Sequence, residues 1–273
     1  MPDTLTIPEL TVVRTTLLRC EVRSATDTAE DSLGELVTRF SPFNSWYRID
    51  SFWEGSFLER TVPGAFKRTI AAHNAASRVD SHQIRTMFNH GMDMQIDAKL
   101  LGDVIDARED DDSPLTVTRL WDTSYNRDLL PGLRSGAYGS SFMFRVVKDE
   151  WNNEPGASDH NPDGLPERTL KEVRVFEAGP VTWPANPAAS AGMRCLSTTD
   201  DYYEALARRD PERVAEMRSQ LTALHPDRLA EAGTRDGGPA DATPDDPASG
   251  HSGGLTHAQR VRLLHLNQRN QTS

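Results

Sequence analysis

The first two hundred residues alternate short runs of β-forming residues with turn residues, and this pattern limits the fold more than any other feature. Runs rich in Val, Ile, Thr, Phe and Trp are typical of strands. Only Pro63–Arg78 and Thr123–Leu133 have the character of helices. Many strands with a few inserted helices favour a mainly β fold of the α+β type, a β-barrel with peripheral helices, over alternating βαβ units. The expected strands are Thr11–Val22, Trp46–Ile49, Ser56–Val62, Ile84–Phe88, Ile96–Ile105, Leu115–Trp121, Ala137–Val147 and Leu170–Ala178.

The composition changes after about residue 199. The segment from Ala232 to Gly254 has no aromatic residue and almost no large aliphatic one, so it cannot bury enough surface to offset its ordering entropy. Before it, Asp210-Pro211-Glu212 has the features of a helix start. After it, Leu255–Leu266 has apolar residues at helical spacing. The sequence therefore predicts a β-rich domain over 1–199, a helical segment over 200–231, a disordered linker over 232–254 and a short amphipathic helix with its tail over 255–273.

Charge and hydropathy exclude several classes of function. The chain has 30 Lys and Arg against 41 Asp and Glu, a net charge of −11, which argues against nucleic-acid binding because acidic surfaces repel phosphates. No run approaches the roughly 18 apolar residues of a membrane span, and the N-terminus lacks the pattern of a signal peptide. We expect a soluble, unsecreted chain without a membrane partner.

The two cysteines, Cys20 and Cys195, lie far apart in the sequence and in no metal-ligand spacing. This argues against a disulfide framework and against a structural zinc site. We expect both to be reduced thiols.

The segment Ala137–Val146 carries two adjacent serines. In a strand, successive side chains point to opposite faces, so Phe142 and Phe144 share one face. Ser141 then points away from that aromatic face and Ser140 points toward it. Taken alone, the segment favours a half-buried strand whose serines merely follow a glycine turn.

Glu177 and His90 are the other candidate polar groups. Alternation puts Glu177 on the face of Val173 and Val175, where an ionised carboxylate is costly unless it has a partner. The alternative is a glutamate turned to water at the end of a strand. His90 stands where the run Ile84–Phe88 meets a loop, a common place for functional groups, although a lone histidine can also be structural.

A metal site formed by His73, His82 and His90 is a further alternative. These residues have no recognised metal-ligand spacing, and none forms an HExxH pattern. A metal-dependent hydrolase is therefore the remote rival.

The order of four motifs resembles that of the prohead (procapsid maturation) serine proteases of tailed phages, relatives in fold of the herpesvirus assembly protease. The resemblance spans about Val12 to Ala189 and implies an assembly-protease-like β-barrel. The motifs are Phe57-Leu58-Glu59-Arg60-Thr61-Val62-Pro63-Gly64-Ala65-Phe66, Phe88-Asn89-His90, Gly139-Ser140-Ser141-Phe142-Met143-Phe144, and Phe176-Glu177 followed by Val181-Thr182-Trp183-Pro184-Ala185-Asn186-Pro187.

The resemblance implies a role for each of three residues. The histidine of the Asn-His motif acts as base, the serine that opens Ser-Phe-x-Phe is the nucleophile, and an acid ahead of the Pro-Ala motif completes a triad. These positions match His90, Ser141 and Glu177.

The chain departs from the family pattern at three places. Gly91 replaces the usual Asp after the histidine, Met143 replaces a small residue, and Ala178-Gly179 replaces Val-Ser. The first departure leaves open whether Asp93, rather than Glu177, orients the histidine. The oxyanion donor also stays open, with backbone N–H groups near Gly139, Arg134 and Arg145 as candidates.

The implied activity is that of a serine endopeptidase that needs no cofactor or metal. Its expected substrate is the major capsid or scaffold protein, inside the immature procapsid in the host cytoplasm. The C-terminal tail would recruit the enzyme into the shell or be removed by self-cleavage. The main alternative is a catalytically inactive capsid assembly or scaffolding factor with the same fold.

Overall fold

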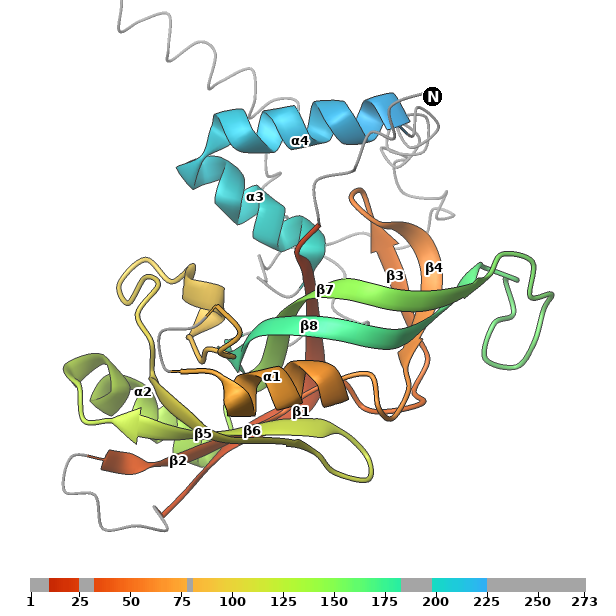
Figure 1. The fold of residues 1–273 in the computed structure, drawn as a ribbon. Coiled ribbons are helices and arrows are strands. Elements are labelled where there is room, and N and C mark those ends of the chain that lie inside the picture. Colours follow the sequence, from red (N-terminus) through yellow and green to blue (C-terminus); the bar gives the residue numbers. More distant parts are fainter. Residues whose placement is uncertain (1–9, 25–31, 78–80, 183–197, 225–273) are drawn as a thin grey trace, which may run out of the picture. The chain divides into compact units, whose positions relative to one another are not determined.

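The computed structural model describes residues 10–24, 32–77, 81–182 and 198–224, and within them the predicted mainly β class with a few helices is confirmed (Figure 1). The predicted linker and C-terminal amphipathic helix lie outside these residues. The strands are β1 (Val12–Arg23), β2 (Ser32–Arg39), β3 (Tyr47–Ser51), β4 (Gly55–Thr61), β5 (Gly102–Glu109), β6 (Pro114–Trp121), β7 (Gly139–Asn152) and β8 (Glu167–Val181). The helices are α1 (Lys67–Ala75), α2 (Ser124–Ser135), α3 (Thr199–Arg209), α4 (Pro211–Leu224) and the short 3₁₀ turn η1 (Asn89–Gly91).

The strands follow the order β3-β4-β8-β7-β1-β2-β6-β5. β1 belongs to two sheets, because Val12–Arg19 pairs with β7 and Cys20–Arg23 pairs with β2. All neighbours are antiparallel except β4 and β8, which are parallel. Among the described residues the end strands β3 and β5 do not pair with each other, so the expected barrel is not closed.

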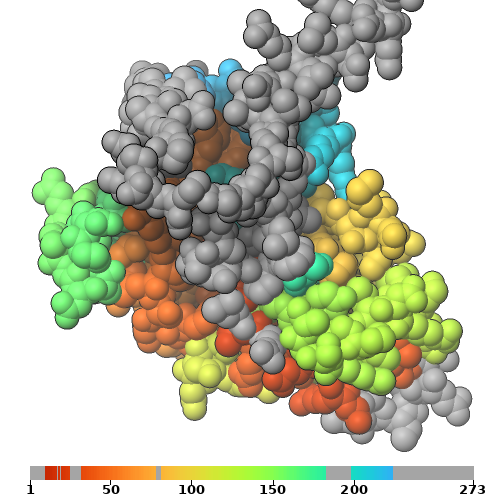
Figure 2. Space-filling view, turned by 180° about the vertical axis from the view of Figure 1, so that it is seen from behind, coloured from red at the N-terminus to blue at the C-terminus, as the bar shows by residue number. Residues whose placement is uncertain are grey.

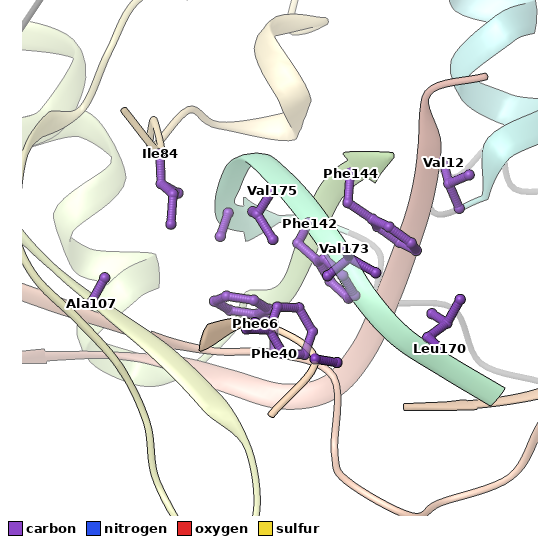
Figure 3. Close-up of a cluster of buried hydrophobic side chains, with 12 residues drawn as sticks. Val12, Phe40, Phe66, Ile84, Ala107, Phe142, Phe144, Leu170, Val173 and Val175 are labelled. Carbon is purple, nitrogen blue, oxygen red and sulfur yellow. The ribbon is translucent and has the colours of Figure 1, made fainter. Parts of the chain in front are cut away.

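Aromatic side chains from distant segments form the core between the sheets (Figure 3). Phe142 and Phe144 of β7 stack with their ring centroids 4.9 Å apart, and Phe40 lies 5.0 Å from Phe142. Phe66, at the start of α1, meets Phe40 edge to face. Burying a side chain of this size contributes about 1.5–3 kcal/mol, so this cluster holds β7 in place, with Phe142 and Phe144 on one face as the sequence predicted.

The helices cover the sheets at separate places. α1 packs against β5 and β8, and α2 packs against β1 and β2 (Figure 1). α3 begins with a capping box between Thr198 and Asp201, and its Tyr203 ring lies 4.3 Å from that of Trp53. The described part of residues 200–231 contains α3 and α4. No helix in the described ranges is long and apolar enough to span a bilayer.

The structure has one strand that was not predicted and lacks all or part of two that were. β2 was not expected, because its buried Glu35 interrupts the apolar pattern; this carboxylate pairs with Arg23 at 2.9 Å. Ile84–Phe88 forms isolated bridges rather than a strand. The strand expected from Ile96 begins only at Gly102.

β7 and β8 form a long hairpin. Their connecting loop, residues 153–166, projects from the domain and is the green lobe at the left of Figure 2. The end of the hairpin opposite this loop brings Gly139 next to Val181, and the candidate site lies near that end.

Candidate active site

The side chains of His90, Ser141 and Glu177 meet in one buried cluster. His90 Nε2 lies 2.7 Å from Ser141 Oγ, and His90 Nδ1 lies 2.6 Å from Glu177 Oε2. The residues expose only 4%, 0% and 1% of their surface, respectively. An ionised carboxylate can only accept, so Glu177 places the imidazole proton on Nδ1 and leaves Nε2 to accept the serine proton. Both distances lie within the hydrogen-bond reach of about 2.6–3.2 Å that nucleophilic catalysis requires between a nucleophile, a base and the group that orients the base.

A β-bulge in β8 turns Glu177 toward Ser141. Val175 pairs with Phe144 and Glu177 pairs with Met143, so Phe176 is an extra residue between them. Directly paired residues share a face, and the extra residue reverses the alternation. The expectation that Glu177 shares the face of Val175 was therefore wrong, because simple alternation does not allow for a bulge.

His90 lies on a tight turn with unusual backbone angles. Asn89, His90 and Gly91 all have positive φ, at 48°, 57° and 69°. Glycine and asparagine adopt this region readily, whereas other residues do so at a cost. Asn89 holds the turn against the end of β8: its Nδ2 donates to Thr182 Oγ1 at 3.2 Å, and its Oδ1 accepts from Thr182 N at 3.0 Å.

The departure at Gly91 has a local explanation. A Cβ at this position would lie 3.0 Å from the Ala98 Cα, in addition to the strain of a φ of 69°. The Asp93 carboxylate caps its own turn instead: its Oδ1 accepts from Gln95 N and Ile96 N, each at 2.9 Å. In this structure Glu177 is the acid at Nδ1.

The second oxygen of Glu177 is also held. Met87 N donates to Glu177 Oε1 at 3.2 Å, and segment 84–88 bridges to β8 through Arg85 N and Phe176 O at 2.9 Å. A Cβ on Gly179 would lie 2.2 Å from Met87 O. Glycine at this position therefore lets segment 84–88 approach β8 closely. The departure from the family pattern at Ala178-Gly179 is thus compatible with the geometry of the site.

Ser141 has two further partners, both from β1. Thr15 Oγ1 donates to Ser141 Oγ at 3.0 Å, and the Arg14 carbonyl lies 2.9 Å from the same oxygen and accepts from it. Ser140 faces the other way and donates to the Arg39 carbonyl. The structure agrees with the predicted orientation of the two serines. The contacts from Thr15 and Arg14 were not predicted, because no local pattern pairs these residues with Ser141.

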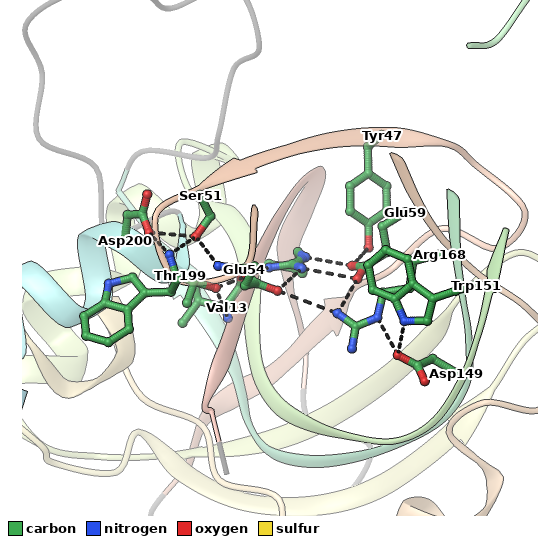
Figure 4. A network of polar contacts seen from close by, with 12 residues as sticks. Val13, Tyr47, Ser51, Glu54, Glu59, Asp149, Trp151, Arg168, Thr199 and Asp200 are labelled. Atoms are coloured by element: carbon green, nitrogen blue, oxygen red, sulfur yellow. Dashed lines mark hydrogen bonds and ion pairs between the residues drawn. The ribbon is translucent and has the colours of Figure 1, made fainter. Parts of the chain in front are cut away.

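A buried ionic network holds the part of β1 that contacts Ser141 (Figure 4). The Arg14 guanidinium lies 2.7 Å from Glu54 and 2.8 Å from Glu59, and Tyr47 donates to Glu59 at 2.7 Å. Burial opposes the charge on Arg14, but the two glutamates raise its pKa well above the usual value. Burial and Glu59 together raise the pKa of Tyr47. The charged arginine therefore fixes the part of β1 whose carbonyl meets Ser141.

The remaining candidates have other surroundings. The Arg145 guanidinium lies over the Phe176 ring, 5.2 Å from its centroid, and Arg134 lies in the last turn of α2. His73 Nδ1 accepts from Ile84 N at 3.2 Å. Within the described part of the chain, no three or more His, Cys, Asp or Glu side chains are grouped so as to hold a metal ion.

Comparison with a model of a protein family agrees with the resemblance of the motifs. A family model described as caudovirus prohead serine protease matches residues 23–202. Among solved structures, the capsid assembly protease gp21 of bacteriophage T4 is similar with a TM-score of 0.32 and 10% identity, over 55% of this chain and 98% of that one. No curated protein matches. The family match covers more than half of the chain, including His90, Ser141 and Glu177, and the chain therefore belongs to the caudovirus prohead serine protease family.

Proposed function

We propose that Ser141, His90 and Glu177 are the catalytic triad of a serine endopeptidase. The observation that carries the proposal is the continuous hydrogen-bonded series from Glu177 through His90 to Ser141. Each side chain comes from a different element, so their meeting is a property of the tertiary fold. Family membership supports the same reaction class.

The geometry supports acyl transfer in two steps. Ser141 Oγ bonds to the scissile carbonyl carbon as its proton passes to His90 Nε2, and Glu177 stabilises the imidazolium. The carbon–nitrogen bond then breaks, and Nε2 protonates the leaving amine. In the second step a water molecule gives its proton to Nε2 and attacks the acyl carbon, which releases the carboxylic acid and restores the Ser141 hydroxyl.

The proposed substrate is the major capsid or scaffold protein, cleaved inside the immature shell in the host cytoplasm. The proposal includes self-cleavage in the C-terminal part of the chain. Family membership supports a substrate related to the capsid.

The experiment combines chemical trapping with capsid processing. Wild-type protein, Ser141→Ala and Ser140→Ala are treated with a small fluorophosphonate and separately co-expressed with the major capsid protein proposed as the substrate. We expect an adduct on Ser141 and capsid cleavage for wild type and Ser140→Ala, and neither for Ser141→Ala. Circular dichroism checks folding, because the buried Ser140 hydroxyl also makes hydrogen bonds.

Two results would count against the proposal. A folded wild-type protein without an adduct and without capsid cleavage would favour the inactive assembly factor. Equal loss of both signals in the two folded serine variants would show that Ser141 is not the specific nucleophile.

A further inference from the structure

A pair of buried hydroxyls joins β6 to the segment that holds Glu177. Thr118 Oγ1 lies 2.7 Å from Thr86 Oγ1, although the two residues are 32 positions apart in the chain, and both side chains are fully buried. The residues paired with Thr118 on the neighbouring strands are Leu36 and Val104. A hydroxyl in such apolar surroundings costs free energy unless it is hydrogen-bonded, so each hydroxyl of this pair needs the other.

Thr86 is the central residue of segment 84–88. Burial alternates along the segment, with Ile84, Thr86 and Phe88 buried and the two residues between them partly exposed. Ile84 packs in one apolar cluster and Phe88 packs in another. Thr86 is therefore a polar residue between two apolar ones, and its hydroxyl faces the interior.

The backbone on either side of Thr86 contacts the proposed acid. Arg85 exchanges two hydrogen bonds of 2.9 Å with the residues that flank Glu177 on β8. Met87 N donates to Glu177 Oε1 at 3.2 Å. Two residues further on, the segment enters the turn η1 that carries His90. The position of Thr86 thus sets which backbone N–H group reaches the carboxylate.

Backbone pairing alone specifies this position weakly. Arg85 pairs with Glu177 and Met87 pairs with Leu100 through isolated bridges, not through a continuous ladder. Strand register is strongly specified only where a slip is costly. A slip of one residue would turn the side chain of Thr86 to the other face and leave two buried hydroxyls unpaired. The hydroxyl pair supplies that cost, since buried polar groups that are fully hydrogen-bonded specify a unique packing.

We propose that Thr118 is a positioning residue of the triad: its hydrogen bond with Thr86 keeps Met87 N on Glu177 and so directs the carboxylate at His90. Thr118 acts through the backbone of segment 84–88. The inference rests on the proposed protease function and adds to it a residue on β6, outside the elements that carry the triad.

Thr116 offers a matched control. It lies two positions before Thr118, so it shares the same face of β6, and it is equally buried. Its Oγ1 has no hydrogen-bond partner among the residues that the structure describes. Replacing Thr by Val keeps the branched shape of the side chain and removes the hydroxyl. The bond to Thr86 is therefore what distinguishes the two positions.

The experiment measures two quantities on the full chain: the rate constant for labelling by the small fluorophosphonate, and the melting temperature. The variants are Thr118→Val, Thr118→Ser, Thr116→Val and the double variant Thr86→Val with Thr118→Val. The double variant leaves neither hydroxyl of the pair buried alone, so most of the stability should return. The bond that places the segment stays absent in it.

We expect Thr118→Val to lower the labelling rate constant at least about fivefold, because small displacements of catalytic groups are costly. Its melting temperature should fall by more than about 2 °C. Thr118→Ser should keep most of the wild-type rate constant, and Thr116→Val should stay within about twofold of it. The double variant should regain most of the melting temperature and keep the low rate constant, which a purely structural role of Thr118 would not produce.

The outcomes separate the inference from the function on which it rests. If the probe does not label wild type, the proposed function fails and the positioning role fails with it. If wild type is labelled, two results overturn the role of Thr118 alone: a folded Thr118→Val that reacts as fast as Thr116→Val, or a double variant that recovers its rate constant together with its stability. Should Thr118→Val not fold, the double variant supplies the comparison with Thr116→Val.

Discussion

At Ser141 a single hydroxyl proton lies between two acceptors, His90 Nε2 at 2.7 Å and the Arg14 carbonyl at 2.9 Å. A hydroxyl donates one hydrogen bond and accepts two. Thr15, which donates to the same oxygen, helps to fix the direction of the remaining lone pair. Reactivity at this residue therefore depends on β1 as well as on His90, and Thr15 is a positioning residue in the proposed reaction.

Removing the Thr15 hydroxyl should slow acylation. A neutral hydrogen bond contributes about 0.5–1.5 kcal/mol, so Thr15→Val should lower kcat and the rate of fluorophosphonate labelling by about 2–12-fold. Thr15→Ser, which restores the hydroxyl, should recover most of the rate. The matched control is Thr16→Val, since Thr16 Oγ1 lies 3.4 Å from Ser140 Oγ instead. Equal losses for Thr15→Val and Thr16→Val would show a general effect on β1.

The buried thiol of Cys20 should make the stability of the protein depend on pH. Burial raises the pKa of this thiol from 9.0 to about 12, an effect that a hydrogen bond with Thr38 only partly offsets. The unfolded chain then ionises at lower pH than the folded one, so the free energy of unfolding should fall as pH rises from about 9 toward 12. Urea titrations across this range should show a smaller fall for Cys20→Ala than for wild type. Equal slopes for the two proteins would contradict the prediction.

Two elements place the proposed acid and base. The bulge at Phe176 turns Glu177 to the face of Ser141, and the turn η1 presents His90. Bulges reorient side chains near active sites in many β proteins. The turn holds three successive positive φ angles, so it depends on contacts outside itself to keep its shape.

Asn89→Ala should lower both the activity and the stability of the protein. The change removes both hydrogen bonds to Thr182 and lets the turn relax away from β8. We expect a loss of more than about tenfold in kcat, with a decrease of about 1–3 kcal/mol in the free energy of unfolding. The control is Asn74→Ala in α1, whose side chain donates a longer bond to the Ala107 carbonyl at 3.5 Å. Full activity of folded Asn89→Ala would exclude the positioning role of this side chain.

At the scale of the whole molecule, the first residues of α3 are hydrogen-bonded to β1 and to the end of β3. Thr199 Oγ1 accepts from Val13 N at 3.1 Å, and Asp200 accepts from Ser51 at 2.7 Å (Figure 4). Asp200 also accepts from Phe52 N at 3.0 Å. Residue 198 is also the one that bridges to Arg14 beside Ser141. The start of the helical segment therefore contacts Val13 and Arg14 of β1. Arg14 and its neighbour Thr15 are the β1 residues that contact the proposed nucleophile.

Self-processing should depend on Ser141. Exposed segments rich in Gly, Pro and Asp are preferred sites of cleavage, and the linker 232–254 has this composition. Concentrated wild-type protein should lose mass by cutting after about residue 197, whereas Ser141→Ala should stay at full length, as measured by intact-mass spectrometry. Equal trimming of both would indicate a contaminating protease. No trimming of either, even with capsid protein present, would rule out self-processing.

Local pattern in the sequence was enough for the mainly β class, for most strands, for α1 and α2, and for the opposite orientations of Ser140 and Ser141. These features depend on neighbours a few residues apart, and alternation, capping and turn residues record them directly. The three residues now brought together were selected by resemblance in motif order, not by composition.

Only the tertiary structure decided how those residues meet. The bulge at Phe176, the close approach that Gly179 allows and the contacts of Thr15 and Arg14 with Ser141 all arise between segments distant in sequence. Strand register and the open order of the sheets are likewise set by packing between elements. Local propensity does not encode such pairings, because their energies depend on which surfaces the whole chain buries together.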